Sequence, residues 1–194
     1  FDETNLYFNN SIGNLYSLDK ENGDLIWITP TKNPNENFQS FLLKSSKIEL
    51  DNENIFISNN QNSLFSIDKR TGFINWRQNI SSEIKPIIID NLIVSISSDG
   101  LFFIVEKNSG NILRITNVYD KFKLRKRKKI KPTGLILDRY KALITLNNGK
   151  ILLVNINNGR TQSIHKLSNN KISRPFINRD SMFVVKDNEI IKLN

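Results

Sequence analysis

A fifteen-residue pattern recurs along the chain and constrains its fold more than any other feature of the sequence. Its first copy, from Gly13 to Trp27, reads GNLYSLDKENGDLIW. Three more complete copies and a shortened one follow, at residues 62–76, 100–114, 149–163 and 188–194. The copies begin about 40 to 50 residues apart, and a period of that length with several short strands is typical of β-propeller blades. The sequence therefore predicts an all-β fold built from repeated blades.

Each copy has the pattern of a β-hairpin. Apolar and polar residues alternate from Leu15 to Asp19, which is the period of a strand with two different faces. A polar turn follows and ends in glycine, which reaches positive φ without a Cβ clash and so permits a tight hairpin. This glycine recurs ten positions into every complete copy, at Gly23, Gly72, Gly110 and Gly159. We therefore interpret these glycines as structural turn residues.

The second strand of the hairpin ends in a tryptophan in the first two copies, at Trp27 and Trp76. An indole can fill the gap between adjacent sheets of a propeller. A shared binding platform for a sugar or a cofactor is the alternative. Arg114 and Ser163 take the same position in the later copies, and this variation favours packing between blades over a shared site. We therefore predict structural roles for both tryptophans.

Two further strands precede the hairpin in the later repeats, and both are rich in β-branched and aromatic residues. The strand nearest the hairpin reads LYFNN, NIFISNN, NLIVSIS, KALITLN and MFVVKD in successive repeats. The more distant strand reads SKIELD, IKPIIID, TGLILD and ISRPFIN. Four strands for each unit indicate four-stranded antiparallel blades.

We expect one propeller domain that is incomplete in this chain, with about four to five blades. The expected units are a partial blade at 1–30, whole blades at 46–80, 84–117 and 133–165, and a partial blade at 172–194. An open propeller would leave strand edges unpaired. We therefore expect the ring to be completed by an N-terminal part of the protein or by a second copy of the chain.

Composition limits the chemistry that this stretch can carry. The 194 residues contain no cysteine, which excludes a disulfide, a zinc thiolate site and a thiol nucleophile within them. His165 is the single histidine, and no glycine-elbow serine motif, Walker loop, GxGxxG motif or calcium loop accompanies it. No apolar run is long enough to span a bilayer. We therefore expect no catalytic residue, no metal site and no bound cofactor.

The repeat, a strand of the form D/N-G-x-L-Y-x-L-D followed by x-x-x-G and x-x-x-W, resembles the pyrroloquinoline-quinone-type β-propeller repeat. This resemblance covers nearly the whole chain. The order of the repeats and the final strand NEIIKLN resemble the C-terminal part of the BamB family, eight-bladed lipoprotein scaffolds of the outer-membrane β-barrel assembly machinery. The resemblance implies an eight-bladed ring at the periplasmic face of the bacterial outer membrane. It also implies a non-catalytic scaffold that binds the periplasmic POTRA domains of the barrel-inserting subunit.

Quinone-dependent dehydrogenases share this repeat, and a fragment of such an enzyme is the alternative. Two features mark those enzymes: the cofactor is clamped against a vicinal cysteine disulfide, and a catalytic aspartate lies beside calcium. This chain has no cysteine. Its acidic residues Asp19, Asp68 and Glu106 stand at the turn of the hairpin, where a carboxylate commonly accepts backbone N–H groups. The sequence therefore favours a scaffold over an enzyme.

Lys121–Lys131, which reads KFKLRKRKKIK, is the most strongly charged stretch of the chain. Eight of its eleven residues are Lys or Arg, whereas the whole chain has a net charge of +9, so the remainder is nearly neutral. The segment is either a solvated surface loop or a contact for an acidic protein surface or for lipid phosphates. Near an anionic membrane, each charge contributes about 1 kcal/mol to binding. The candidate contact residues are Lys121, Phe122, Lys123, Leu124, Arg125, Lys126, Arg127, Lys128 and Lys129.

Nucleic acid is a further possible partner of this basic segment, because clustered cations neutralise phosphates. The charge is confined to one connector, and no DNA- or RNA-binding module is recognisable beside it. We therefore expect no specific nucleic-acid binding.

The other long connector, Thr29–Ser45, reads TPTKNPNENFQSFLLKS, and its prolines and amides indicate an irregular excursion. In the BamB family, as the resemblance implies, connectors at one face of the ring supply the partner-binding surface. Phe38, Phe41 and Leu42 are then the candidate anchors, and burial against the underlying blade is the alternative.

Overall fold

The computed structural model describes residues 1–32, 43–178 and 181–193. Its contacts divide the chain into two compact units, of which unit 1 holds residues 1–91 and 106–111 and unit 2 holds residues 92–105 and 112–194. The regular elements in the described ranges are β-strands and one short α-helix. No helix in these ranges is long and apolar enough to cross a membrane.

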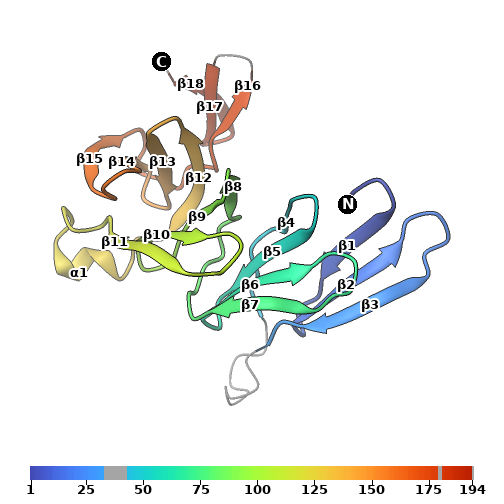
Figure 1. Ribbon diagram of the computed structural model, residues 1–194. Coiled ribbons are helices and arrows are strands. Elements are labelled where there is room, and N and C mark those ends of the chain that lie inside the picture. The colour runs from blue at the N-terminus through green and yellow to red at the C-terminus, as the bar shows by residue number, and fades with distance from the viewer. Residues whose placement is uncertain (33–42, 179–180, 194) are drawn as a thin grey trace. The chain divides into compact units, whose positions relative to one another are not determined.

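The strands form five antiparallel sheets, and within each sheet the neighbours are consecutive in sequence (Figure 1). The first sheet contains β1 (Asn5–Asn9), β2 (Asn14–Asp19) and β3 (Leu25–Pro30). The second contains β4 (Glu49–Leu50), β5 (Asn54–Asn59), β6 (Ser63–Asp68) and β7 (Ile74–Gln78). The third contains β8 (Ile87–Ile89), β9 (Leu92–Ile96), β10 (Leu101–Glu106) and β11 (Ile112–Asn117).

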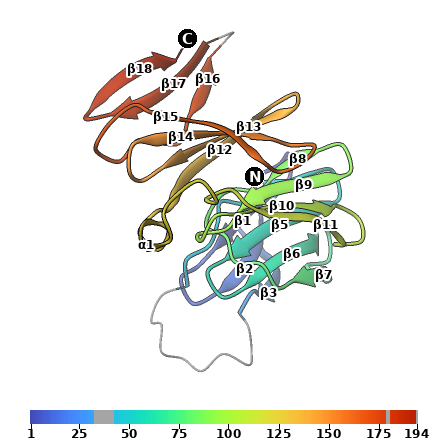
Figure 2. The same ribbon diagram turned by 90° about the vertical axis from the view of Figure 1, so that its left-hand side faces the viewer.

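The fourth sheet contains β12 (Pro132–Asp138), β13 (Lys141–Leu146), β14 (Lys150–Asn155) and β15 (Thr161–Lys166). The fifth contains β16 (Phe176–Asn178), β17 (Ser181–Lys186) and β18 (Glu189–Leu193). Helix α1 (Leu124–Arg127) lies in the connector between β11 and β12, as Figures 1 and 2 both show. The predicted all-β fold of three- and four-stranded antiparallel sheets is confirmed.

The first strand of the blade is shorter than the sequence pattern suggested in three of the sheets. Strands β8 and β16 each begin directly after a proline, Pro86 and Pro175, which has no N–H group to donate to a neighbouring strand. Before β4, the hydroxyl of Ser46 accepts the N–H group of Ser58 at 3.0 Å, in place of a regular ladder contact. Local backbone chemistry therefore sets where these strands begin.

The hairpin turn is closed by backbone and carboxylate hydrogen bonds, as the second copy illustrates. The N–H group of Gly72 donates to the carbonyl of Asp68 at 2.9 Å. The Asp68 carboxylate accepts the N–H groups of Arg70 and Thr71 at 3.0 and 2.7 Å. Asp19 caps the first turn in the same way. These carboxylates serve the turn, as their position in the repeat predicted.

Each of the four complete hairpins also contains a shift of register at the same place in the repeat. The shifts fall at Ser17/Leu18, Ser66/Ile67, Ile104/Val105 and Leu153/Val154. Such a bulge inserts one residue into one strand and increases the local twist. Because the shift recurs at the same position, each copy of the repeat encodes both the hairpin turn and the twist of its outer strand.

The tryptophan of the first copy packs on the turn glycine of the second. Trp27, 9% exposed, donates its indole N–H to the carbonyl of Lys69 at 3.1 Å. A Cβ atom at Gly72 would lie 2.6 Å from the indole ring, so only glycine leaves room for it. The Thr29 hydroxyl donates to the carbonyl of Gly72 at 2.5 Å. The outer strand of the first sheet is therefore fastened to the turn of the second.

The same contact recurs between later copies, with one change of chemistry. The indole of Trp76 donates to the carbonyl of Lys107 at 2.9 Å, and a Cβ at Gly110 would lie 2.6 Å from its ring. In unit 2, Arg114 takes the tryptophan position, and its guanidinium donates to the carbonyl of Asn157 in the next turn. Indole and guanidinium thus each donate a hydrogen bond to the next turn, the guanidinium to a carbonyl one position further along the repeat.

Apolar burial in unit 1 is concentrated between the first two sheets. The cluster comprises the inward-facing side chains of both, namely Tyr7, Leu15, Trp27, Ile55, Ile57, Phe65 and Ile67. On β1, β2 and β3 the cluster residues alternate with more exposed ones, which is the pattern of a sheet with one face buried, whereas β5 and β6 are buried on both faces. The tryptophan therefore belongs to the core of unit 1.

Ion pairs tie the turns of unit 1 together. The Lys69 ammonium lies 3.0 Å from the Asp2 carboxylate, and the Lys107 ammonium lies 2.8 Å from Asp51. Burial raises the pKa of Asp2, but the N–H groups of Asn5 and Thr4, the Lys69 ion pair and the Tyr7 hydroxyl outweigh it and lower that pKa to about 2. Asp2 therefore stabilises unit 1 in its ionised form.

We predict that Gly72→Ala destabilises the chain more than Gly23→Ala. Both glycines have positive φ, of 75° and 77°, so a Cβ introduces about 1–2 kcal/mol of backbone strain at either position. Only at Gly72 does the Cβ also meet the Trp27 ring, because nothing lies within 4 Å of a Cβ at Gly23. The free energy of unfolding, measured by urea titration, should fall by about 1–3 kcal/mol more for Gly72→Ala. Equal losses would show that the indole does not rest on Gly72.

We also predict a pH-dependent loss of stability that involves Asp2. Its folded pKa is about 2, below the ordinary value of 3.8, so its stabilising effect is present above pH 3.8 and is lost as the pH falls toward 2. Solvent screening limits the effect to about 1 kcal/mol or less. In urea titrations over this pH range, Asp2→Asn should show a smaller decline than the wild type. The neighbouring exposed carboxylate offers a control, since Glu3→Gln should decline as the wild type does.

Candidate partner-binding surface

The connector after β11 starts with residues that are firmly held in unit 2. Val118 and Tyr119 are buried. The N–H group of Val118 donates to the carbonyl of Gly100 at 2.9 Å, and its carbonyl accepts the Thr161 hydroxyl at 2.8 Å. Burial raises the pKa of the Tyr119 hydroxyl far above its ordinary value, so this group stays neutral. The basic segment therefore leaves the sheet from a fixed point.

Several side chains of the basic segment Lys121–Lys131 hold the segment itself in place. Arg127 donates from Nε to the carbonyl of Phe122 at 2.9 Å and from its guanidinium to the carbonyl of Asp120 at 2.7 Å. Asn147 donates to the carbonyl of Lys129 at 3.0 Å and accepts the N–H group of Lys131 at 2.9 Å. Arg127 is therefore an internal support of the segment, although the sequence suggested it as a partner contact.

The apolar residues of the basic segment divide into two groups. Phe122 is 7% exposed and packs edge-on against Tyr119 with 5.9 Å between ring centroids, and Ile130 is also buried. Phe122 therefore anchors the segment to unit 2, and only a small part of its ring is left for the partner contact that the sequence predicted. Leu124, on α1, is 76% exposed. It is the apolar side chain of the segment that a partner can reach.

The remaining cations of the segment face solvent without a carboxylate partner. Six of the candidate cations are exposed, namely Lys121, Lys123, Arg125, Lys126, Lys128 and Lys129. Among the described residues, the three ion pairs join other side chains, at Asp2, Glu49 and Asp51. Lys121 instead donates to the carbonyl of Gln162 at 3.0 Å. This surface is therefore strongly positive and not neutralised from within the described chain.

Two lysines outside the segment join it around a hollow of about 730 Å³, here called the basic hollow. Its cationic lining comprises Arg125, Lys126 and Lys129 from the segment, Lys150 at the start of β14 and Lys166 at the end of β15. Phe122, Ile130, Asn148 and Asn169 complete the lining. The Lys150 ammonium lies 5.1 Å from the centroid of the Phe122 ring, a cation–π contact.

Sequence reasoning missed Lys150 and Lys166, because they are distant from the charged run. The hairpin repeat contained the signal, since it pairs these two positions across β14 and β15. In the first and third copies the equivalent pairs are Asn14 with Pro30 and Leu101 with Asn117. The lysine pair is therefore a departure from the repeat.

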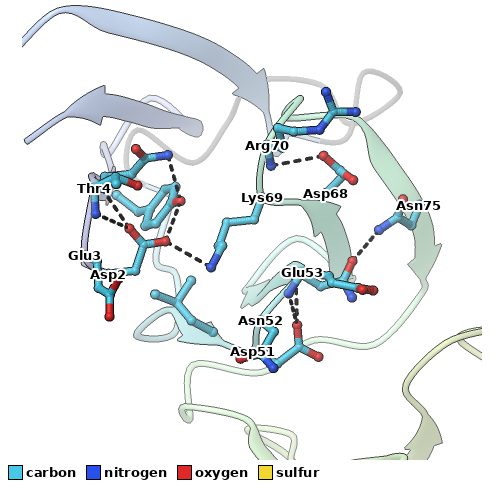
Figure 3. A pocket seen from close by; sticks show the side chains of 14 residues that line it. Asp2, Glu3, Thr4, Asp51, Asn52, Glu53, Asp68, Lys69, Arg70 and Asn75 are labelled. Carbon is cyan, nitrogen blue, oxygen red and sulfur yellow. Dashed lines mark hydrogen bonds and ion pairs between the residues drawn. The ribbon is translucent and has the colours of Figure 1, made fainter.

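A second hollow, of about 1140 Å³, lies in unit 1 among the turns of the first two sheets (Figure 3). Three of its carboxylates are engaged in local structure, since Asp2 binds Lys69, Asp51 accepts the N–H groups of Glu53 and Asn54, and Asp68 caps its own turn. Among the described residues, no group of three or more His, Asp or Glu side chains is arranged to hold a metal ion. The three aspartates of this hollow therefore have structural partners.

The single histidine lies on β15 and contacts a serine. Its Nε2 atom is 2.9 Å from the Ser163 hydroxyl, and both side chains lie on the same face of the strand, two residues apart. In the described part of the chain, no hydrogen bond joins His165 to a carboxylate. The contact therefore lacks the third member that orients the base of a catalytic triad.

The other predicted partner contacts, Phe38, Phe41 and Leu42, lie outside the described residues. Their role stays a prediction from the sequence.

The fold of the chain is similar to those of several solved structures. The chain is similar over 99% of its length to the crystal structure of BamB from Moraxella catarrhalis, with a TM-score of 0.80 and 13% identity. It is similar over the same share to the computationally designed Ika8 protein, with a TM-score of 0.71 and 13% identity. The designed Ika4 protein matches 76% of the chain, with a TM-score of 0.56, 14% identity and 91% of its own length covered.

The chain spans 56% of the length of the BamB and Ika8 structures, so it corresponds to about half of either. No curated protein sequence matches it. At the level of sequence, the family described as outer membrane protein assembly factor BamB matches residues 1–116, which is more than half of the chain. On this match and on the repeated antiparallel sheets, the chain belongs to the family of outer membrane protein assembly factor BamB.

Proposed function

We propose that this chain is part of a non-catalytic scaffold that acts in the assembly of outer-membrane β-barrel proteins. The match of residues 1–116 to the family of an outer-membrane assembly factor is the observation that carries this proposal. The site chemistry supports it, because Asp2, Asp51 and Asp68 in the hollow of unit 1 are bound in turns and ion pairs, and the Ser163–His165 contact has no orienting carboxylate in the described chain. The proposed location is the periplasmic face of the bacterial outer membrane.

The proposed protein partner is the barrel-inserting subunit, bound through its periplasmic POTRA domains. On the side of this chain, we propose Phe38, Phe41 and Leu42 as the anchors, since large apolar side chains in a connector are the kind that dominate binding energy at interfaces. The exposed cations of the basic segment are distant from these anchors in the sequence. A scaffold with two surfaces can hold one partner while it contacts another.

We predict that Phe38→Ala combined with Phe41→Ala weakens binding to the periplasmic domains of the barrel-inserting subunit. If both rings are buried by the partner, the dissociation constant should rise at least about tenfold, mainly through faster dissociation. Biolayer interferometry with immobilised periplasmic domains measures both rates. Phe73→Ala is the matched control, because this ring is 76% exposed at another turn. An equal effect of both changes, or no effect of the double variant, would contradict the assigned anchors.

We also predict that the chain does not turn over alcohols with pyrroloquinoline quinone. The purified protein, incubated with the quinone and calcium, should show no bound-quinone absorbance and no dye-linked oxidation above a heat-killed sample. Quinone-dependent turnover in this assay would replace the scaffold with the dehydrogenase alternative.

A further inference from the structure

Lys150 and Lys166 are placed directly opposite each other on β14 and β15. Side chains of such a pair leave neighbouring strands on the same face, about 4.5–5.5 Å apart at Cβ, and like charges there are destabilising. The equivalent pairs in the first and third copies carry no charge. The repeat therefore does not require two lysines at this place.

Three more cations converge on the same lysine pair. Arg125, Lys126 and Lys129 line the basic hollow from the α1 side, and no carboxylate lines it. None of these five side chains forms an ion pair with a carboxylate in the described ranges. The hollow thus gathers five positive charges that an external anion with several oxygen atoms can neutralise.

The geometry of the hollow is held by groups other than these cations. Arg127 and Asn147 bind the backbone of the segment, and Phe122 and Ile130 are buried beneath it. The cations are therefore presented by a supported backbone, which reduces the ordering that a ligand has to impose. The Asn148 and Asn169 amides beside them can donate to phosphate oxygen atoms.

The exposed side chain of Leu124 distinguishes between the possible classes of anionic partner. Leu124 is 76% exposed and stands between Lys123 and Arg125. An exposed apolar side chain flanked by cations suits a membrane interface, where the cations meet lipid phosphates and the apolar group enters the acyl boundary. Single-stranded nucleic acid would instead need an exposed aromatic ring for stacking, but the aromatic ring of the segment, Phe122, is buried.

We propose that unit 2 docks on an anionic membrane surface, with lipid phosphate groups in the basic hollow and Leu124 inserted at the boundary with the acyl chains. The protein-binding anchors lie elsewhere in the sequence, so this contact does not depend on the protein partner. It gives the scaffold an additional, electrostatic contact with a lipid surface.

Flotation with vesicles tests this proposal. The full chain should bind vesicles of phosphatidylglycerol and phosphatidylcholine, and should not bind vesicles of phosphatidylcholine alone. Lys150→Gln combined with Lys166→Gln should weaken binding about 10- to 30-fold, since each lysine near an anionic surface changes the affinity about fivefold. The matched control, Lys141→Gln combined with Lys192→Gln, removes the same charge from exposed positions outside the hollow and should bind nearly as the wild type does.

Leu124→Gln separates insertion from charge attraction. This variant should bind the anionic vesicles several-fold more weakly, while the dependence of its affinity on salt stays that of the wild type. Thermal melting followed by circular dichroism checks that every variant is folded. The hollow variant should also bind the barrel-inserting subunit as the wild type does, which distinguishes this contact from the proposed protein contact.

Four outcomes would overturn the proposal. Equal weakening by the hollow variant and its matched control would assign vesicle binding to net charge alone. Unchanged binding by Leu124→Gln would exclude insertion. A hollow-dependent affinity for a single-stranded oligonucleotide, without one for the vesicles, would assign the site to nucleic acid. Binding of inorganic phosphate without binding of vesicles would assign it to a soluble anion.

Discussion

The contact between the outer strand of one repeat and the turn glycine of the next is the interaction on which the rest of the structure depends. Trp27 on Gly72 and Trp76 on Gly110 use the same two elements, an indole that donates to a turn carbonyl and a turn without a Cβ. A sheet of three or four strands cannot bury both of its faces alone. Because the first three sheets reach the following turn in this way, the turn glycine contributes to packing between repeats as well as to the local hairpin.

The spacing of the repeat and the alternation within it explain how much of the fold the sequence could predict. Turn glycines, hairpin strands and four strands for each unit all follow from spacing and alternation, which are local properties. The starts of the first strands do not, since Pro86 and Pro175 shorten β8 and β16 and the Ser46 hydroxyl interrupts the approach to β4. Helix α1 was also missed, because a run of cations without apolar periodicity gives no signal for a single helical turn.

The candidate site was predictable only in its charge. The run from Lys121 to Lys129 identified a basic surface, but it did not reveal that Phe122 and Arg127 support the segment from within. It also gave no indication of Lys150 and Lys166, since these residues join the surface through strand register. Side chains that are distant in sequence but are brought together by strand pairing can be recognised only from the register of each hairpin. The division of the segment into supporting and exposed residues depends on tertiary packing, which local sequence does not encode.

The departures from the repeat are not scattered, and their grouping links the fold to the proposed function. Arg114 stands where the earlier copies have tryptophan, and it keeps the hydrogen bond to the next turn through a guanidinium. The lysine pair of β14 and β15 stands where other copies have uncharged residues. Arg114 lies on the strand before the connector that carries the basic segment, and the lysine pair lines the basic hollow together with that segment, all within unit 2. The three ion pairs of the described residues all lie in unit 1, whereas this part of unit 2 keeps the packing of the repeat and leaves its cations without a carboxylate partner. Since like charges gathered without partners oppose folding, their grouping around the basic hollow is an argument for the proposed anionic ligand.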